Sequence, residues 1–273
     1  MSIRSILTNY TGNGGGPAAL RMAIKMAQKY NAHLTAAVWL PENPLRHQAG
    51  TFLTPEIARI IDTYDSDFVQ GRRADFQAAV DAAGLSDRAT FEVYGPRERT
   101  INEAARGHDV VVIGTASDTA RGQDFAVRPD VVALRSGRPV IVVPHAYNSP
   151  TIVETAAVAW DGKRAAARAL ADAMHILGTK QRVILMGVGD NLPADYGSDV
   201  MRLMERHGIA AEMKILSPGP DGVGQTIIDA CAAAHIGLLV MGAYEHSKFT
   251  EDLLGGTTRD ILENSPVPVL MSH

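Results

Sequence analysis

Gly237-Leu-Leu-Val-Met-Gly242 opens the stretch that decides the fold, and Pro268-Val-Leu-Met-Ser272 closes it. Each segment contains a short, continuous apolar run, which is typical of a strand buried on both faces of a parallel sheet. Between them, Gly255-Gly-Thr-Thr258 leads into Arg259-Asp-Ile-Leu262, which predicts a helix start. The free amide N–H groups and the positive dipole end of a helix N-terminus suit a phosphate. The stretch therefore predicts a strand, a loop, a helix and a final strand, with an anion site at the start of the helix.

The spacing of the glycines in this stretch resembles the nucleotide-binding loop of the universal stress protein family. That loop has a glycine, two residues, a second glycine, nine residues, a third glycine and then Ser or Thr. Here Gly242 and Gly255 stand at the first and third glycines, whereas Glu245 replaces the second and Gly256 stands at the Ser or Thr position. Thr257-Thr258 would supply the missing hydroxyl. This part of the chain is therefore similar to that family in spacing and differs from it at two positions.

The same order of strands and helices occurs twice in the 273 residues. The clearest repeat pairs His108-Asp-Val-Val-Val-Ile-Gly114 with His235-Ile-Gly-Leu-Leu-Val-Met-Gly242. Alternating strands and helices predict parallel sheets with right-handed crossovers. The resemblance implies an α/β fold of two Rossmann-like (adenine nucleotide alpha hydrolase-like) domains, residues 1–148 and 149–273. Each would be a five-stranded parallel sheet with helices on both faces.

The apolar runs locate the strands of this fold. They predict strands at Ile3–Leu7, Leu34–Leu40, Ala89–Tyr94, Val110–Ile113 and Val140–Val143, then at Val153–Trp160, Arg182–Val188, Ala211–Leu216, Leu238–Met241 and Val267–Met271. Helices are expected between them, among them one that Thr54 caps ahead of Pro55, one over Arg97–Arg106 and one over Lys163–Leu177. An exposed apolar last strand needs a cover, so the domains are expected to pair through Val140–Val143 and Val267–Met271 as an intramolecular pseudo-dimer. Two chains could also pair as a homodimer.

Open α/β sheets bind ligands at the carboxyl ends of their strands, where the strand order reverses. The family's strand order places this point between strands one and four of each domain. In the second domain these strands end at Asp161 and Gly242, so both residues should face one crevice. The resemblance implies contacts to an adenine nucleotide from the following set: Asp161, Val188, Gly242, Gly255, Gly256, Thr257 and Thr258.

Three of these assignments have structural alternatives. Asp161 could cap the helix that begins near Lys163. Gly242 could be required by the turn alone, and the pair Gly255-Gly256 could serve close helix packing. Glu245 would repel phosphates unless a metal ion or a lysine such as Lys248 intervened.

The first domain departs from the nucleotide-binding pattern. Its first strand ends at Thr8-Asn9-Tyr10, without the aspartate, and Ser117 and Val127, followed by Arg128, stand where the later loop residues would be. Without those glycines the backbone cannot easily wrap a triphosphate. We expect this domain to serve structural pairing or to bind something else.

Two other glycine-rich stretches resemble phosphate-binding motifs in spacing. Gly12-Asn-Gly-Gly-Gly-Pro17 begins like a dinucleotide fingerprint, but proline stands at the third glycine position, which favours a flexible turn. Gly219-Pro-Asp-Gly-Val-Gly-Gln-Thr226 has P-loop spacing, but Gln225 replaces the lysine that would reach the outer phosphates. This second stretch is therefore interpreted as a loop followed by a helix start.

Composition limits the partners and the compartment. A net charge of −4 argues against nucleic acid or an anionic membrane as the main partner, and no apolar run approaches the ~18 residues of a membrane span. The single cysteine, Cys231, excludes an intrachain disulfide and indicates a reducing compartment, so cytoplasm is expected. Cys231 lies among small apolar residues of a predicted helix, which favours a buried, inert thiol.

The resemblance implies a stress-response regulator or sensor that binds ATP, ADP or AMP, with magnesium as an accompanying ion, in the second domain. The alternative is a tandem stress protein that binds no nucleotide and works through protein contacts or another small ligand. No catalytic triad, zinc-ligand spacing or nucleophile elbow is found, so no catalytic or metal-binding residue is assigned. At most a weak ATPase activity is expected.

Overall fold

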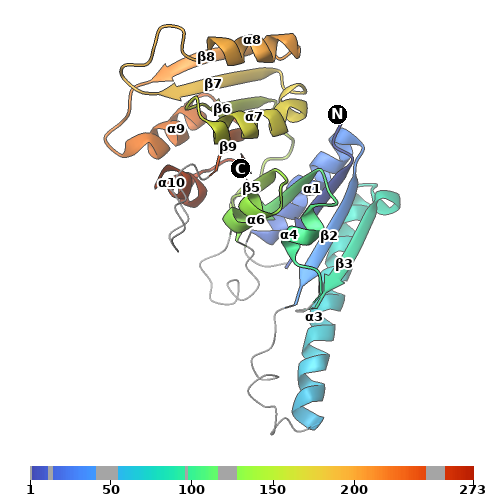
Figure 1. Cartoon of the computed structure of the whole chain (residues 1–273). Coiled ribbons are helices and arrows are strands. Elements are labelled where there is room, and N and C mark those ends of the chain that lie inside the picture. Colours follow the sequence, from blue (N-terminus) through green and yellow to red (C-terminus); the bar gives the residue numbers. More distant parts are fainter. Residues whose placement is uncertain (1, 12–14, 41–54, 96–97, 116–127, 244–255) are drawn as a thin grey trace.

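A single twisted sheet runs through the whole molecule (Figure 1). The computed structural model describes residues 2–11, 15–40, 55–95, 98–115, 128–243 and 256–273. Its strands are β1 Ser5–Asn9, β2 His33–Trp39, β3 Ala89–Tyr94, β4 Val110–Gly114, β5 Val140–Val143, β6 Thr155–Ala159, β7 Arg182–Val188, β8 Ala211–Leu216, β9 Leu238–Gly242 and β10 Val269–Ser272. The first half of the chain holds β1 to β5 and the second half holds β6 to β10.

Helices connect these strands. The described helices are α1 Gly16–Tyr30, α3 Pro55–Ala82, α4 Ile101–Ala105 and α6 Pro129–Arg135 in the first half, and α7 Arg164–Leu177, α8 Ser198–Arg206, α9 Gly222–Ala233 and α10 Gly256–Asn264 in the second, with a short 3-10 helix at Ser86–Arg88. None of the helices in the described ranges is both long and apolar enough to cross a bilayer.

Each half has the same strand order. The complete sheet has ten strands in the order β3-β2-β1-β4-β5-β10-β9-β6-β7-β8, and within each half all strand pairs are parallel. The strand order reverses between β1 and β4 and again between β6 and β9. The predicted fold of two Rossmann-like parallel sheets is therefore confirmed, and the structure adds that the two sheets are continuous.

Antiparallel pairing of the two last strands joins the halves. Val269 lies opposite Val142, Leu270 opposite Ile141 and Met271 opposite Val140. All residues of β5 and β10 are buried. An unpaired apolar edge exposes backbone N–H and C=O groups together with side chains, and this pairing covers both edges at once. These strands lie in the segments in which the sequence predicts the contact; the domain boundary after residue 148 stays a prediction.

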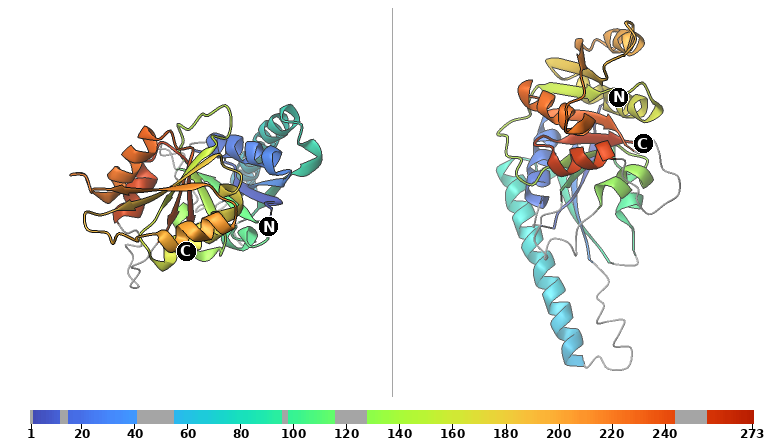
Figure 2. Two further views of the ribbon diagram at one scale, coloured as in Figure 1. Left: turned by 90° about the horizontal axis from the view of Figure 1, so that it is seen from above. Right: turned by 90° about the vertical axis from the view of Figure 1, so that its left-hand side faces the viewer.

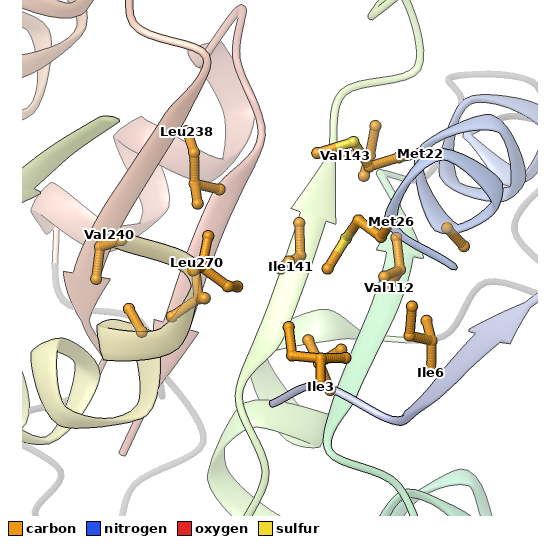
Figure 3. Close-up of a cluster of buried hydrophobic side chains, with 14 of the residues drawn as sticks. Ile3, Ile6, Met22, Met26, Val112, Ile141, Val143, Leu238, Val240 and Leu270 are labelled. Atoms are coloured by element: carbon orange, nitrogen blue, oxygen red, sulfur yellow. The ribbon is translucent and has the colours of Figure 1, made fainter. Parts of the chain in front are cut away.

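The two faces of the sheet carry separate apolar layers. One layer packs under α1, α3, α7 and α8 and includes residues of both halves, and the other packs under α4, α6, α9 and α10. Figure 3 shows the first layer at the junction, where Met22 of α1 lies near Val143 and Met26 near Ile141 of β5, with Leu270 of β10 on the neighbouring strand. Because this layer includes residues from both halves, the halves share one core.

Two helices of the first half, α4 and α3, can be compared with the helix starts predicted from the sequence. α4 begins at Ile101, not at the predicted Arg97, because Thr100 and Glu103 form a capping box: the Glu103 N–H donates to Thr100 Oγ1, and the Thr100 N–H donates to Glu103 Oε2 at 2.8 Å. α3 has 28 residues and projects beyond the sheet (Figures 1 and 2). It begins at Pro55 as predicted, and its predicted cap, Thr54, lies outside the described residues.

Polar contacts reinforce the junction beside α1. Lys29 of α1 forms an ion pair with Glu154 of the connecting segment, with a distance of 2.8 Å between Nζ and Oε2. Lys180, just after α7, donates from Nζ to the carbonyl oxygen of Val153 at 2.6 Å. Burial of the Lys180 ammonium group lowers its pKa from 10.5 to about 8, and the neighbouring Glu154 carboxylate opposes this shift.

We predict that Lys180 makes stability depend on pH between about 8 and 10.5. In this range the unfolded chain binds the Lys180 proton and the folded chain does not, so the free energy of unfolding gains a term that rises with pH. Below pH 8 both states hold the proton and this term is constant. Chemical denaturation of wild type and Lys180→Met between pH 7 and 10.5 should give curves that differ in slope above pH 8.

The control is Lys214→Met, which removes an exposed lysine of β8. Parallel pH profiles for wild type and Lys180→Met would contradict the prediction.

Candidate functional site

Three neighbouring strands of the second half end at one edge of the sheet. Ala159 of β6 is in register with Met186 of β7, and Val158 is in register with Val240 of β9. The Trp160 N–H donates to the Met186 carbonyl oxygen at 2.8 Å. The carboxyl ends of β7, β6 and β9 therefore lie side by side. The structure thus brings Asp161, Val188 and Gly242 to the same edge of the sheet.

Asp161 lies in a tight turn between β6 and α7. Gly162 follows it with a φ of 76°, a conformation that favours glycine. Asp161 Oδ1 accepts a hydrogen bond from the Lys163 N–H at 3.0 Å, and the Lys163 ammonium group lies 3.8 Å from Oδ2. The Asp161 side chain is 55% exposed. This bond closes a turn ahead of α7; Lys163 is the N-cap residue of that helix and no side chain caps it, so the predicted capping role of Asp161 is not seen. The exposed carboxylate faces solvent at the edge where a ligand is expected.

Gly242 is required by the close approach of helix α7. A Cβ atom at Gly242 would lie 2.4 Å from the carbonyl carbon of Ala165 and 2.5 Å from the nitrogen of Ala166. The first half repeats this arrangement, because a Cβ at Gly114 would lie 2.2 Å from the carbonyl carbon of Gly15. The sequence suggests that a turn or a ligand requires a glycine at position 242. The structure shows a third reason, which is the close packing of the α7 backbone against this residue.

Helix α10 begins at the same edge because it connects β9 to the parallel strand β10. A Cβ at Gly256, its first residue, would contact nothing within 4 Å among the described residues. Gly256 thus shows no close packing of its own, and the packing role suggested for the pair Gly255-Gly256 stays a prediction. Thr257 is half-buried, whereas Thr258 is buried. Gly255, Glu245 and Lys248 lie outside the described residues.

The close contact of α10 instead involves Gly224 of α9. A Cβ at Gly224 would lie 2.9 Å from Asp260 Cβ. Thr226 Oγ1 donates to the Gly222 carbonyl oxygen at 2.8 Å and accepts from the Gly219 N–H at 2.9 Å. The P-loop-like spacing of this stretch thus serves helix packing and a local turn. α9 begins at Gly222, inside the stretch that the sequence predicts to be a loop followed by a helix start.

Tyr196 is a residue of this edge that the sequence analysis missed. Its hydroxyl donates to the Trp160 carbonyl oxygen at 2.6 Å, and its ring covers Gly187, where a Cβ would lie 2.6 Å from Tyr196 Cε1. Burial raises the Tyr196 pKa, and the charge of Asp161 raises it further. Tyr196 therefore lies close to Asp161 between the ends of β6 and β7. The only signal in the sequence was a glycine inside an apolar strand, which often marks a close approach.

The corresponding edge of the first half carries other residues. Asn9 is the last residue of β1, and no aspartate follows it. Arg128 precedes α6 and forms an ion pair with the buried Asp130. Ser117 and Val127, the two other positions compared with the nucleotide loop, lie outside the described residues.

The described residues contain no group of three His, Cys, Asp or Glu side chains that could hold a metal ion. Cys231 is buried in α9, as predicted, and burial raises the pKa of its thiol to about 12. The thiol therefore stays protonated at physiological pH.

The fold and the strand ends define a protein with two Rossmann-like halves. The model of the universal stress protein family matches residues 221–273, which contain β9, α10 and β10. A universal stress protein from Archaeoglobus fulgidus superposes with a TM-score of 0.73 at 15% identity, over 98% of this chain and 96% of that one. A functionally unknown protein from Pseudomonas aeruginosa superposes with a TM-score of 0.56 at 15% identity, over 99% and 92%.

A comparison with curated proteins gave no match. At 15% identity the two structural matches describe the fold alone. The resemblance to the universal stress protein family is confirmed for residues 221–273, which match its sequence model. For the rest of the chain, the comparison with the universal stress protein from Archaeoglobus fulgidus shows a shared fold.

We predict opposite effects for two glycine substitutions at this edge. Gly242→Ala places a methyl group against the backbone of α7 and should destabilise the protein by roughly 1–3 kcal/mol, as overpacking does. Gly256→Ala meets no neighbour and should leave stability unchanged or raise it by up to about 1 kcal/mol. Chemical denaturation without added ligand measures both. Equal effects of the two substitutions would contradict the packing explanation.

Proposed function

We propose that the chain is a stress-response regulator or sensor that binds an adenine nucleotide in its second half. The observation that carries this proposal is the convergence of Asp161, Val188 and Gly242 at the point where the strand order reverses between β6 and β9. Ligands of open α/β sheets bind at such points. The carboxylate of Asp161 is exposed there and would accept hydrogen bonds from the adenosine part.

The start of α10 supports a phosphate contact. Four amide N–H groups at a helix N-terminus have no partner within the helix, and the helix dipole adds positive charge there. Gly256 is exposed and lets the phosphates approach the backbone closely, and Thr257 is half-buried beside it. Thr258 is buried in this structure, so we assign it to packing and keep Thr257 as the hydroxyl contact. Magnesium would be held by the phosphates and water.

The alternative is a tandem stress protein that binds no nucleotide and acts through protein contacts or another small ligand. One observation favours it: Asp161 already accepts a hydrogen bond from the Lys163 N–H and lies near the Lys163 ammonium group. Its carboxylate thus has a structural role whether or not a ligand binds.

The test is thermal unfolding with millimolar ATP and magnesium, ADP or AMP. We predict that the melting temperature rises with nucleotide concentration, since a ligand at 100 times its Kd stabilises the native state by about 2.7 kcal/mol. Asp161→Ala should weaken binding about tenfold or more, the effect of losing a hydrogen bond to a charged group. Asp229→Ala is the charge-matched control, because Asp229 lies on the surface of α9, away from the strand ends, and accepts a hydrogen bond from Gln225.

An unchanged melting temperature with all three nucleotides would contradict nucleotide binding. The double substitution Glu245→Gly with Gly256→Ser then identifies the cause. Serine fits at position 256 because the added Cβ meets no atom within 4 Å. Binding that appears only in this variant would show that the altered loop has lost the nucleotide, and would favour the alternative function.

A further inference from the structure

Helix α3 is anchored to the sheet only near its carboxyl end. Among the side chains of this helix that the structure describes, only Phe76 and Val80 are buried. Phe76 packs on Phe91 of β3, with ring centroids 5.6 Å apart. Residues 62–75 of the same helix belong to neither apolar layer, and this part of α3 projects beyond the sheet (Figures 1 and 2).

The projecting part of α3 exposes apolar surface. The helix has 28 residues and is therefore about 42 Å long at 1.5 Å per residue. Tyr64 is 69% exposed, more than any other large apolar side chain in the described part of the chain. Most of the stability of a protein helix comes from the packing of one of its faces against a neighbour. The exposed face of α3 therefore has the properties of a contact surface.

A regular line of residues runs along this exposed face. Its members follow one another at alternating steps of four and three residues, and we call them the α3 seam: Tyr64, Phe68, Gly71, Asp75, Ala78 and Ala82. Phe68 and Gly71 are half-buried and the other members are exposed. Alternating steps of four and three form the line along which a second helix packs in a coiled coil. The seam lies about 100–140° around the helix from Phe76 and Val80, so the sheet and a second helix would contact different faces.

Gly71 lies in the middle of the seam, where the structure of one copy does not require a glycine. A Cβ atom at Gly71 would contact nothing within 4 Å among the described residues. Glycine inside a helix destabilises it by roughly 0.5–1 kcal/mol relative to alanine. The absence of a side chain does, however, allow the backbone of a second helix to approach closely. Gly71 thus marks a point of close approach for a partner helix.

The order of side chains along the seam matches a second copy of the same helix in the antiparallel direction. The aromatic members, Tyr64 and Phe68, come first, and the small members follow. When two copies run in opposite directions, Phe68 of one lies opposite Gly71 of the other. Tyr64 then lies opposite Asp75, and its hydroxyl can donate a hydrogen bond to that carboxylate.

A parallel pair would not have this complementarity. Each member of the seam would then lie opposite its own copy, so that the two Asp75 carboxylates would repel each other and the two Gly71 residues would leave a gap. Arg72 holds Phe68 and Asp75 in place beside the seam. Its guanidinium group lies 5.8 Å from the centre of the Phe68 ring and 3.0 Å from the Asp75 carboxylate.

We propose that two copies of the chain associate through α3, as an antiparallel pair of helices that cross at Phe68 and Gly71. The surface lies on the side of β3, an outer strand of the sheet, and is separate from the contact of β5 with β10 inside each chain. It is also independent of the proposed nucleotide site. One helix face is small for a protein interface, so this association is weak and depends on protein concentration.

Sedimentation velocity of the full chain, over a roughly hundredfold range of concentration, tests the association. The mass should rise from the 29.2 kDa of one chain toward twice that value. Gly71→Gln has room in a single copy but holds a partner helix away, so it should weaken self-association about tenfold or more without lowering the melting temperature of dilute protein. Ser66→Gln is the matched control, because Ser66 is exposed on the opposite face of α3, and it should leave association unchanged.

Cross-linking tests the direction of the pair. Cys231 is the only cysteine and is buried, so a thiol introduced on α3 is the reactive one. Tyr64→Cys and Asp75→Cys proteins are mixed and oxidised. We expect disulfides that join the two variants, because in an antiparallel pair the two copies of residue 64 lie about 16 Å apart along the helix axis.

A wild-type chain that sediments as a monomer at every concentration would overturn the proposal. Self-association that Gly71→Gln leaves unchanged would overturn it too, as would disulfides that join identical positions in preference to positions 64 and 75. Circular dichroism of each variant establishes that the fold is retained.

Discussion

The antiparallel contact between β5 and β10 is the constraint on which the rest of the structure depends. Without this contact, each five-stranded sheet would end in an apolar strand, β5 or β10, whose backbone N–H and C=O groups have no partner strand. Pairing the two edges makes one ten-stranded sheet and leaves β3 and β8 as its outer strands. It also brings α1 of the first half next to the segment that leads into β6, so that Lys29 reaches Glu154 and the apolar layer continues across the junction.

The two halves share their backbone packing and differ in what they present at the strand ends. In both, a glycine at the end of the fourth strand admits the first helix: Gly114 faces Gly15, and Gly242 faces Ala165. The exposed Asp161 and the open start of α10 belong to the second half and suit an anionic ligand with a polar base. The first half has a buried asparagine, a stacked pair of aromatic rings and an ion-paired helix start. The two halves therefore differ at the strand ends and not in the core, and it is the strand ends that decide what each could bind.

The sequence predicted the fold well, because its signals are local. Apolar and alternating stretches located β3, β7, β8 and β9 to within one residue, and the repeated pattern implied the doubled sheet. The predicted start of α4 was wrong because the capping box of Thr100 and Glu103 sets the first residue of this helix.

The roles of Gly242, Gly224 and Tyr196 could not be predicted, since each depends on a backbone or side chain that is distant in sequence and close in the fold. Asp161 and Gly242 lie at one edge of the sheet as expected, with Val188 beside them, and the contact of all three with a ligand stays a prediction.

The central claim is that two similar halves have different ligand chemistry, with phosphate recognition kept in the second half alone. Isothermal titration calorimetry of the purified chain with ATP and magnesium tests it most directly, because it counts sites without a label or a substitution. The account predicts one ATP bound per chain. Two ATP per chain would contradict the expectation that the first half binds no triphosphate, and no binding heat at several temperatures would contradict the nucleotide site proposed for the second half.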